Sequence, residues 1–111
     1  MTDKIVVLST CGSLAEARKV ARSLVENRLA ACVNIVPGIQ SIYRWQDEVE
    51  EAGEVLLLVK TGRDLLAQVS EAIKQLHSYE LPETIALPVV DGSVPYLAWL
   101  AGGLKAADGP R

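Results

Sequence analysis

Residues 30–61 have the sequence AACVNIVPGIQSIYRWQDEVEEAGEVLLLVKT, which predicts two long β-strands folded back on each other. Residues 30–45 form the first strand, residues 46–47 the turn and residues 48–60 the return strand. About fifteen residues at roughly 3.3 Å each give about 50 Å of strand, whereas a domain of this length has a radius of gyration of about 13 Å. The hairpin should therefore project beyond its own domain.

The far half of this hairpin carries apolar side chains that a chain of 111 residues has little material to cover. They are Ile39, Ile42, Tyr43, Trp45 and Val49. An uncovered apolar surface in a small protein marks an interaction site, and the simplest partner is a second copy of the chain. We therefore expect a homo-oligomer whose interface contains these residues, although the two aromatic rings could instead stack on a ligand.

Composition indicates one small domain, which we place at residues 1–105 with a frayed tail at 106–111. Half of the residues are hydrophobic, the net charge is -3 and the pI is about 5.1. Because no basic block is present, we expect neither a nucleic acid nor a membrane as partner. The start MTDKIVVLST resembles neither a secretory signal nor a spanning helix, so we expect a cytoplasmic protein. Two cysteines are too few for a disulfide framework.

The segments on either side of the hairpin alternate strand and helix. We predict a strand at 4–10, a helix at 13–28 opened by a capping box, a second helix at 63–77, a strand at 84–90 and a short closing helix near 96–104. The resulting order, βαββαβ followed by a helix, is that of the ferredoxin-like α+β fold, an antiparallel sheet with its helices on one face.

Two features of the hairpin strands carry further expectations. Pro37 removes a ladder donor and Gly38 permits a bulge, so the first strand should bend there. The unbroken apolar run of residues 55–59 is typical of a central strand that is covered on both faces.

The order of elements also predicts which polar residues meet. Right-handed crossovers would make strands 4–10 and 48–60 adjacent and parallel, with strand 84–90 antiparallel beside the first. One edge of the sheet would then gather polar groups from distant positions, namely Cys11, Lys60, Thr61, His77, Tyr79 and Glu83.

Several blocks of the chain resemble, in the right order, the signature blocks of the CutA divalent-cation tolerance family. They are ACVNI at 31–35, PG at 37–38, SIYRW at 41–45, EVL at 54–56, VKT at 59–61, HSY at 77–79, PE at 82–83 and YLAWL at 96–100. The resemblance covers nearly the whole chain. It implies a ferredoxin-like homotrimer, related in architecture to PII-type signalling proteins and associated with tolerance to copper and other divalent metals. It implies no known reaction.

The chain departs from the family pattern at several positions. Asp47 and Ser78 stand where members commonly have glycine and proline, and aspartate tolerates the left-handed turn conformation. Ser9, Ala72 and Leu76 stand at positions where some members carry an extra cysteine and histidine suited to copper. Metal binding at these three positions is therefore not carried over.

Each candidate site residue has a structural alternative. For His77, the functional interpretation is a soft-metal ligand or proton carrier. The structural interpretation is a histidine stabilised by the dipole of the preceding helix. Cys11 is a thiol with a pKa lowered by the following helix, or an ordinary loop thiol, whereas Cys32 reads as core. Lys60 holds an anion or pairs with a glutamate. A metal site of Cys11 and His77 would need Glu83, water or a neighbouring chain to complete it.

Three classes of function remain. The resemblance favours a trimeric divalent-cation (copper) tolerance protein that binds metal weakly between subunits, with no obligatory cofactor. The second class is a PII-like sensor whose intersubunit cleft takes a small anionic ligand. Its contacts would be Lys60, His77, Tyr79 and Glu83, with Trp45 as an aromatic wall. The third is a hydrolase or transferase; because no nucleophile elbow or triad order is visible, we expect no enzymatic activity.

Overall fold

The structure, a computed structural model, describes residues 2–107. Its elements are β1 (Lys4–Cys11), α1 (Leu14–Glu26), β2 (Cys32–Trp45), β3 (Glu48–Gly62), a short 3-10 turn η1 (Arg63–Leu65), α2 (Leu66–Leu76), β4 (Ile85–Pro88) and α3 (Val94–Gly102). The predicted order and the α+β class are confirmed. Most of the predicted tail, residues 108–111, lies outside the described residues, while Ala107 packs against the core.

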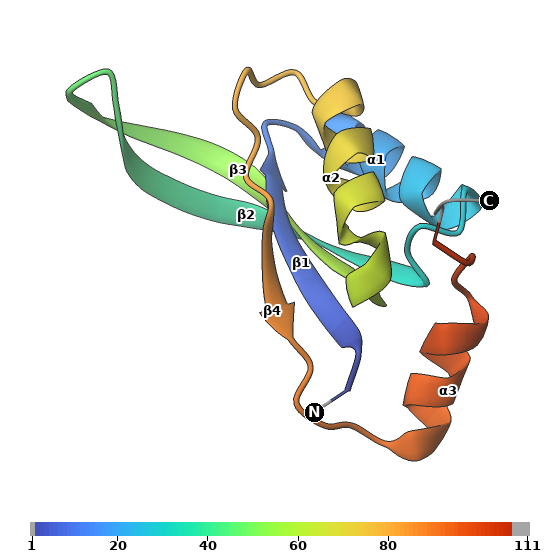
Figure 1. The fold of residues 1–111 in the computed structure, drawn as a ribbon. Helices are drawn as coiled ribbons and strands as arrows, with labels where there is room; N and C mark the ends of the chain where they lie inside the picture. Colours follow the sequence, from blue (N-terminus) through green and yellow to red (C-terminus); the bar gives the residue numbers. More distant parts are fainter. Residues whose placement is uncertain (1, 108–111) are drawn as a thin grey trace.

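The four strands form one sheet in the order β2-β3-β1-β4, in which every neighbouring pair is antiparallel. Helices α1 and α2 lie together on one face of this sheet (Figure 1). The core fills the space between that face and the two helices, and includes Val7, Val20, Leu24, Leu57 and Ile73, none of which is exposed.

The predicted parallel pairing of the first and third strands is wrong. Each crossover helix makes the two strands that flank it parallel, while the hairpin reverses the chain between β2 and β3. β1 is therefore antiparallel to β3, with Cys11 opposite Val55 and Val6 opposite Lys60. The C-terminal end of β1 consequently lies beside the point where the hairpin leaves the sheet. The C-terminal end of β3 lies at the other end of the strands, beside the start of β1.

The β2-β3 hairpin extends away from the rest of the domain, as predicted (Figure 1). The ladder shifts register between Val36 and Ile39, so the predicted bulge is present, and Gly38 takes φ 79° there. At the tip, Gln46 and Asp47 have φ 50° and 67°, the two positive values that a tight type I′ hairpin turn requires. The molecule measures 43 × 32 × 25 Å with a radius of gyration of 14.6 Å.

Most of the second face of the sheet is not covered by the described residues, and Tyr96 of α3 reaches it only at Lys60. Burial alternates along β1 and along the inner half of β3, so that one side chain is buried and the next is partly exposed. The middle of this partly exposed set is apolar and consists of Val6, Leu8, Leu56 and Leu58, with the more exposed Leu87 of β4 beside them. β3 is central, as predicted, but residues 2–107 bury its apolar run on one face only.

Helix α1 begins with the predicted cap. The Ser13 side chain accepts a hydrogen bond from the Glu16 N–H at 3.1 Å. Helix α2 is shorter than predicted, because residues 63–65 form the 3-10 turn and His77 already has the extended φ and ψ of −84° and 145°. β4 ends at Pro88 and is an edge strand, in agreement with the position of proline in the sequence.

Candidate functional site

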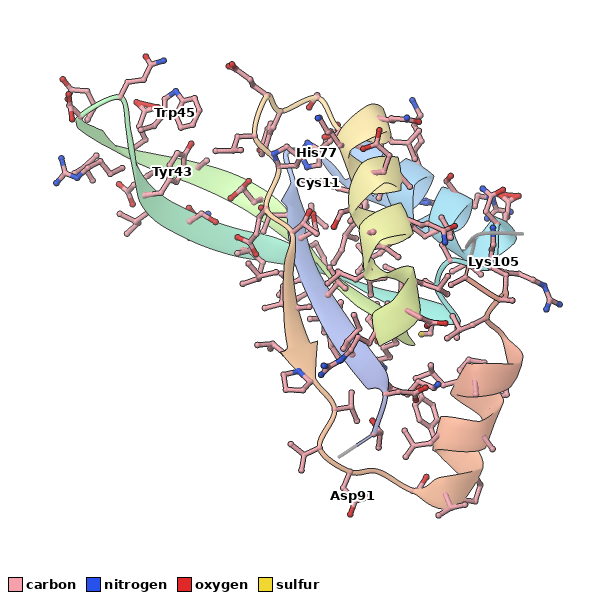
Figure 2. All side chains as sticks on the ribbon, in the orientation of Figure 1. Cys11, Tyr43, Trp45, His77, Asp91 and Lys105 are labelled. Carbon is pink, nitrogen blue, oxygen red and sulfur yellow. The ribbon has the colours of Figure 1, made fainter. Side chains whose placement is uncertain are left out.

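His77 lies where the end of α2 meets the end of β1 (Figure 2), and its side chain is fully buried. Its Nε2 bonds the Thr10 carbonyl oxygen, and its Nδ1 lies 3.0 Å from the Tyr79 backbone nitrogen. A carbonyl can only accept and an N–H can only donate, so Nε2 carries the hydrogen and Nδ1 accepts. The contacts define the neutral Nε2–H tautomer. The imidazole therefore links β1 to the loop after α2. Stabilisation of a charged histidine by the helix dipole does not account for these two bonds.

Glu16, from the first turn of α1, completes the polar group around this histidine. Its carboxylate accepts hydrogen bonds from the backbone N–H and the hydroxyl of Ser78, and one oxygen lies 4.0 Å from His77 Nδ1. Partial burial acts to raise the pKa of Glu16, but the bonds from Ser78, the proximity of His77 and the Gly12 backbone outweigh it, so the pKa lies below its ordinary value. The capping box is thus only half formed. The Ser13 side chain caps the helix, but the Glu16 carboxylate binds Ser78.

Cys11 is the last residue of β1 and is completely buried. Burial, followed by the nearby charges of Glu16 and Glu54, raises the pKa of this thiol to about 11. The predicted lowering by the helix N-terminus is therefore wrong, and so is the alternative of an ordinary loop thiol. Cys32, in contrast, is partly exposed and lies opposite Lys60 in the ladder, not in the core.

The sulfur of Cys11, a carboxylate oxygen of Glu16 and a ring nitrogen of His77 all lie within 4.8 Å of one another. Within residues 2–107, no other set of three such side chains is as close. The structure thus brings together two of the predicted metal ligands, Cys11 and His77, but the third is Glu16 and not Glu83. Glu83 is exposed and lines a different part of the surface.

Tyr79 connects this cluster to the hairpin. Its hydroxyl donates to Glu54 Oε2 at 2.9 Å, and its ring lies 4.6 Å from the ring of His77. A side chain at Gly12 would place its Cβ 3.0 Å from the Tyr79 hydroxyl, so the glycine admits the ring at this position. Burial and the bond to the Glu54 carboxylate raise the pKa of Tyr79 to about 12.

Beyond Tyr79, a hollow of about 750 Å³ lies between the far half of the hairpin and the loop that follows α2. Its walls include the aromatic rings of Tyr43, Trp45 and Tyr79, together with four glutamate carboxylates. Figure 2 shows Tyr43 and Trp45 on the hairpin, away from Cys11 and His77 at its base. Of the described residues that line this hollow, none is lysine or arginine.

Lys60 does not belong to this region. It lies opposite Val6, five residues along β1 from Cys11, or about 17 Å at 3.4 Å per residue. Its Nζ lies 3.4 Å from the Tyr96 hydroxyl and 5.7 Å from the centre of the Tyr96 ring. The predicted gathering of Lys60 with Cys11 and His77 is therefore wrong, because it depended on the parallel pairing. Thr61, fully buried, donates to the Leu29 carbonyl at 2.7 Å and has a structural role.

The five predicted interface residues occupy two faces of the hairpin. The ladder pairs Ile39 with Glu54, Tyr43 with Glu50 and Trp45 with Glu48, and residues that are paired or two apart share a face. Ile42 and Val49 lie on the other face, where they are 68% and 64% exposed. Tyr43, Trp45 and Ile42 line the hollow, whereas Ile39 and Val49 do not.

Two residues of this region were absent from the sequence-based site. Glu16 falls in the predicted capping box of the helix at 13–28, and Glu54 falls in the predicted return strand of the hairpin. The periodicity of α1 offered no signal for Glu16. An antiparallel assignment would have placed Glu54 beside the end of β1, since Val55 is opposite Cys11.

An α+β sandwich with an extended hairpin and a buried thiol, carboxylate and imidazole at its base defines a protein that can present soft and hard metal ligands together. Residues 5–102 match the family model described as CutA1 divalent ion tolerance protein. The chain belongs to the CutA1 divalent ion tolerance family, and the predicted resemblance is confirmed.

Relatives of known name support this assignment. The divalent-cation tolerance protein CutA of Thermus thermophilus is 56% identical over 95 residues, which cover 86% of this chain and 92% of that protein. The human protein CutA is 46% identical over 91 residues, but the match spans only 51% of the human chain. The Arabidopsis relative is named chloroplastic and a structure from Archaeoglobus fulgidus is described as periplasmic, so the family name identifies no compartment.

Solved structures agree with the fold. The Cut A1 structure from Thermus thermophilus superposes with a TM-score of 0.90 at 52% identity, covering 92% of this chain and 99% of that one. CutA1 from Oryza sativa superposes with a TM-score of 0.91 at 41% identity, covering 94% and 95%. None of the helices in residues 2–107 is long and apolar enough to cross a membrane.

Proposed function

We propose that this chain is a homotrimeric divalent-cation tolerance protein that binds a metal ion such as copper weakly at Cys11, Glu16 and His77. The observation that supports the metal site is the approach of three ligand atoms of different elements to within 4.8 Å of one another. Sulfur and nitrogen ligands suit copper and zinc, and a carboxylate oxygen adds charge.

The hydrogen bonds around the site explain why binding should be weak. The thiol must lose its proton to become a ligand, and its pKa of about 11 opposes this at neutral pH. The Nδ1 lone pair of His77 is already occupied by the Tyr79 N–H. A metal ion therefore competes with one proton and one hydrogen bond, and binds only when its concentration rises.

The same competition offers a response to metal. Coordination at His77 Nδ1 would release the Tyr79 N–H, and Tyr79 holds Glu54 at the base of the hairpin through its hydroxyl. A change at the buried cluster would thus reach the hairpin through one residue. In a trimer whose hairpins contact neighbouring chains, metal would alter the contacts between subunits.

Assembly is supported by apolar surface that the described part of the chain leaves uncovered. The open sheet face carries Leu56 and Leu58, and the hairpin carries the exposed Ile42 and Val49. Helix α3 is apolar around its circumference, yet Trp99 is 55% exposed. Helices of this composition are normally buried. A second and third copy of the chain are the simplest cover for these surfaces.

Calorimetric titration with copper and zinc tests the metal site. We expect Cys11→Ser and His77→Ala to abolish binding, and Cys32→Ser, which removes the other free thiol, to leave it unchanged. Because the pKa of Cys11 is raised, its thiol stays protonated until about pH 11, so affinity should increase about tenfold per pH unit below that value, with one proton released per ion.

Binding that survived Cys11→Ser, or that showed no dependence on pH, would contradict a site at this cluster. Equal loss in Cys11→Ser and Cys32→Ser would instead indicate general damage to the fold. Circular dichroism of each variant distinguishes that outcome from the loss of a ligand.

The alternative of a PII-like sensor for a small anionic ligand has less support within one chain. Its predicted cation, Lys60, lies at the opposite edge of the sheet beside Tyr96. Trp45, Tyr79 and Glu83 do line one hollow, but that hollow is acidic and would repel an anion.

A further inference from the structure

We propose that the hollow between the hairpin and the loop after α2 binds a small organic cation of the alkylated ammonium type, such as a quaternary ammonium group. This site is separate from the metal cluster and does not depend on the metal-binding function proposed above. Its volume of about 750 Å³ lies within the range of small-molecule sites, roughly 300 to 1,000 Å³.

The aromatic side chains of the hollow carry the first part of the argument. Tyr43, Trp45 and Tyr79 come from two segments far apart in the sequence and line one space. Within one chain, Trp45 and Tyr43 are 40% and 42% exposed and contact no other ring among the described residues. The negative face of an aromatic ring attracts a cation, and tryptophan does so best.

The charge of the hollow carries the second part. Carboxylates of Glu50, Glu54, Glu80 and Glu83 line it, and the lysine and arginine side chains of the described residues do not. Four negative groups around aromatic walls favour a positive ligand and exclude an anionic one. An uncharged apolar ligand would gain nothing from the carboxylates.

The arrangement fits an organic cation better than a metal ion. A divalent metal needs several ligand atoms within a few ångströms, and in residues 2–107 only the Cys11 cluster brings three such atoms together. The carboxylates of the hollow are spread around its wall instead. A bulky, weakly hydrated cation can touch the rings while the carboxylates balance its charge at longer range.

The hollow also has no spare hydrogen-bond donor from Tyr79, because its hydroxyl already donates to Glu54. The bond holds the Tyr79 ring in place as one wall of the hollow.

Titration of the full-length protein with choline, followed by calorimetry and tryptophan fluorescence, tests this proposal. We expect choline and tetramethylammonium to bind in the millimolar range or tighter and to change the emission of Trp45. The neutral isostere of choline, in which carbon replaces the quaternary nitrogen, should bind at least about tenfold more weakly, since it keeps the shape but loses the charge.

Two matched pairs of variants locate the site. Trp45→Leu should weaken choline binding by about fivefold or more and abolish the fluorescence change, whereas Trp99→Leu, at the other tryptophan, should do neither. Glu50→Gln should weaken binding by about threefold, while Glu51→Gln should change it less than twofold. Glu50 lines the hollow and pairs with Tyr43, whereas Glu51 is next to it in the sequence and does not line the hollow.

Light scattering on each variant shows whether its assembly is unchanged. Equal affinity for choline and its neutral isostere would overturn the proposal, and so would equal effects within either pair of variants. A third outcome is that choline does not bind and that Trp45 is shielded from a soluble quencher in the free protein. The hollow would then be filled by protein atoms, and the proposal would be overturned. Cys11→Ser should lose copper binding and Trp45→Leu should lose choline binding. Because each variant affects one ligand, the two proposals are tested separately.

Discussion

At the scale of single residues, the hydrogen-bond partners decide what each side chain can do. His77 uses both ring nitrogens inside the protein, one on the end of β1 and the other on the following loop. Glu16 holds the same loop through Ser78. Two residues that read separately as a helix cap and a helix end therefore act together to position Tyr79 over Gly12.

A pair of buried hydroxyls allows a direct test of these energetics. Ser9 is fully buried and its hydroxyl has no hydrogen-bond partner within the described part of the chain, whereas the equally buried Thr61 donates to Leu29. Removing an unsatisfied hydroxyl removes a desolvation cost. We expect Ser9→Ala to raise the free energy of unfolding by about 1 kcal/mol, and Thr61→Val to lower it by about 1 to 3 kcal/mol. Urea unfolding measures both, and a loss of stability in Ser9→Ala would show that packing of the hydroxyl matters more.

At the scale of elements, the hairpin is the part whose shape follows most directly from local sequence. The Pro37-Gly38 pair marks the bulge, and the turn falls on the two residues predicted for it, Gln46 and Asp47. The β-branched and aromatic residues between them favour strand. What local sequence did not reveal is which face of the hairpin meets which partner.

The turn provides a prediction at this scale. Asp47 takes φ 67°, a conformation that costs an L-residue free energy and glycine almost none. Asp47→Gly should therefore raise the free energy of unfolding by about 0.5 kcal/mol, and Asp47→Ala should lower it by a similar amount. Thermal unfolding at a fixed protein concentration compares the three proteins. If glycine and alanine had the same effect, the left-handed conformation would not be the source of strain.

At the scale of the whole molecule, residues 2–107 cover one face of the sheet and leave the apolar middle of the other face open. Helices α1 and α2 occupy the covered face (Figure 1), while Leu56 and Leu58 lie on the open one. A single layer of helices on a sheet with two apolar faces is stable only when something covers the second face. The proposed trimer meets this need.

Light scattering tests the assembly. The protein should have about three times the 12.0 kDa mass of the chain. Leu58→Glu should reduce this mass to that of one chain, since an unpaired carboxylate in a dry interface costs several kcal/mol. Leu14→Glu, at a 48% exposed position on α1, is the control and should leave the mass unchanged. A wild-type mass of about 12 kDa, or a Leu58→Glu protein that stays assembled, would contradict the proposal.

The sequence alone determined the order of elements, the hairpin with its bulge and turn, and the family, because these depend on local patterns and on short signature blocks in a fixed order along the chain. The tertiary structure decided which residues share the site. Strand direction separates Lys60 from Cys11, and packing brings Glu16 and Glu54 to His77 and Tyr79 from distant positions. The environment of Cys11 was also invisible locally. Its pKa depends on burial and on carboxylates from two other elements, which only the folded chain places around the thiol.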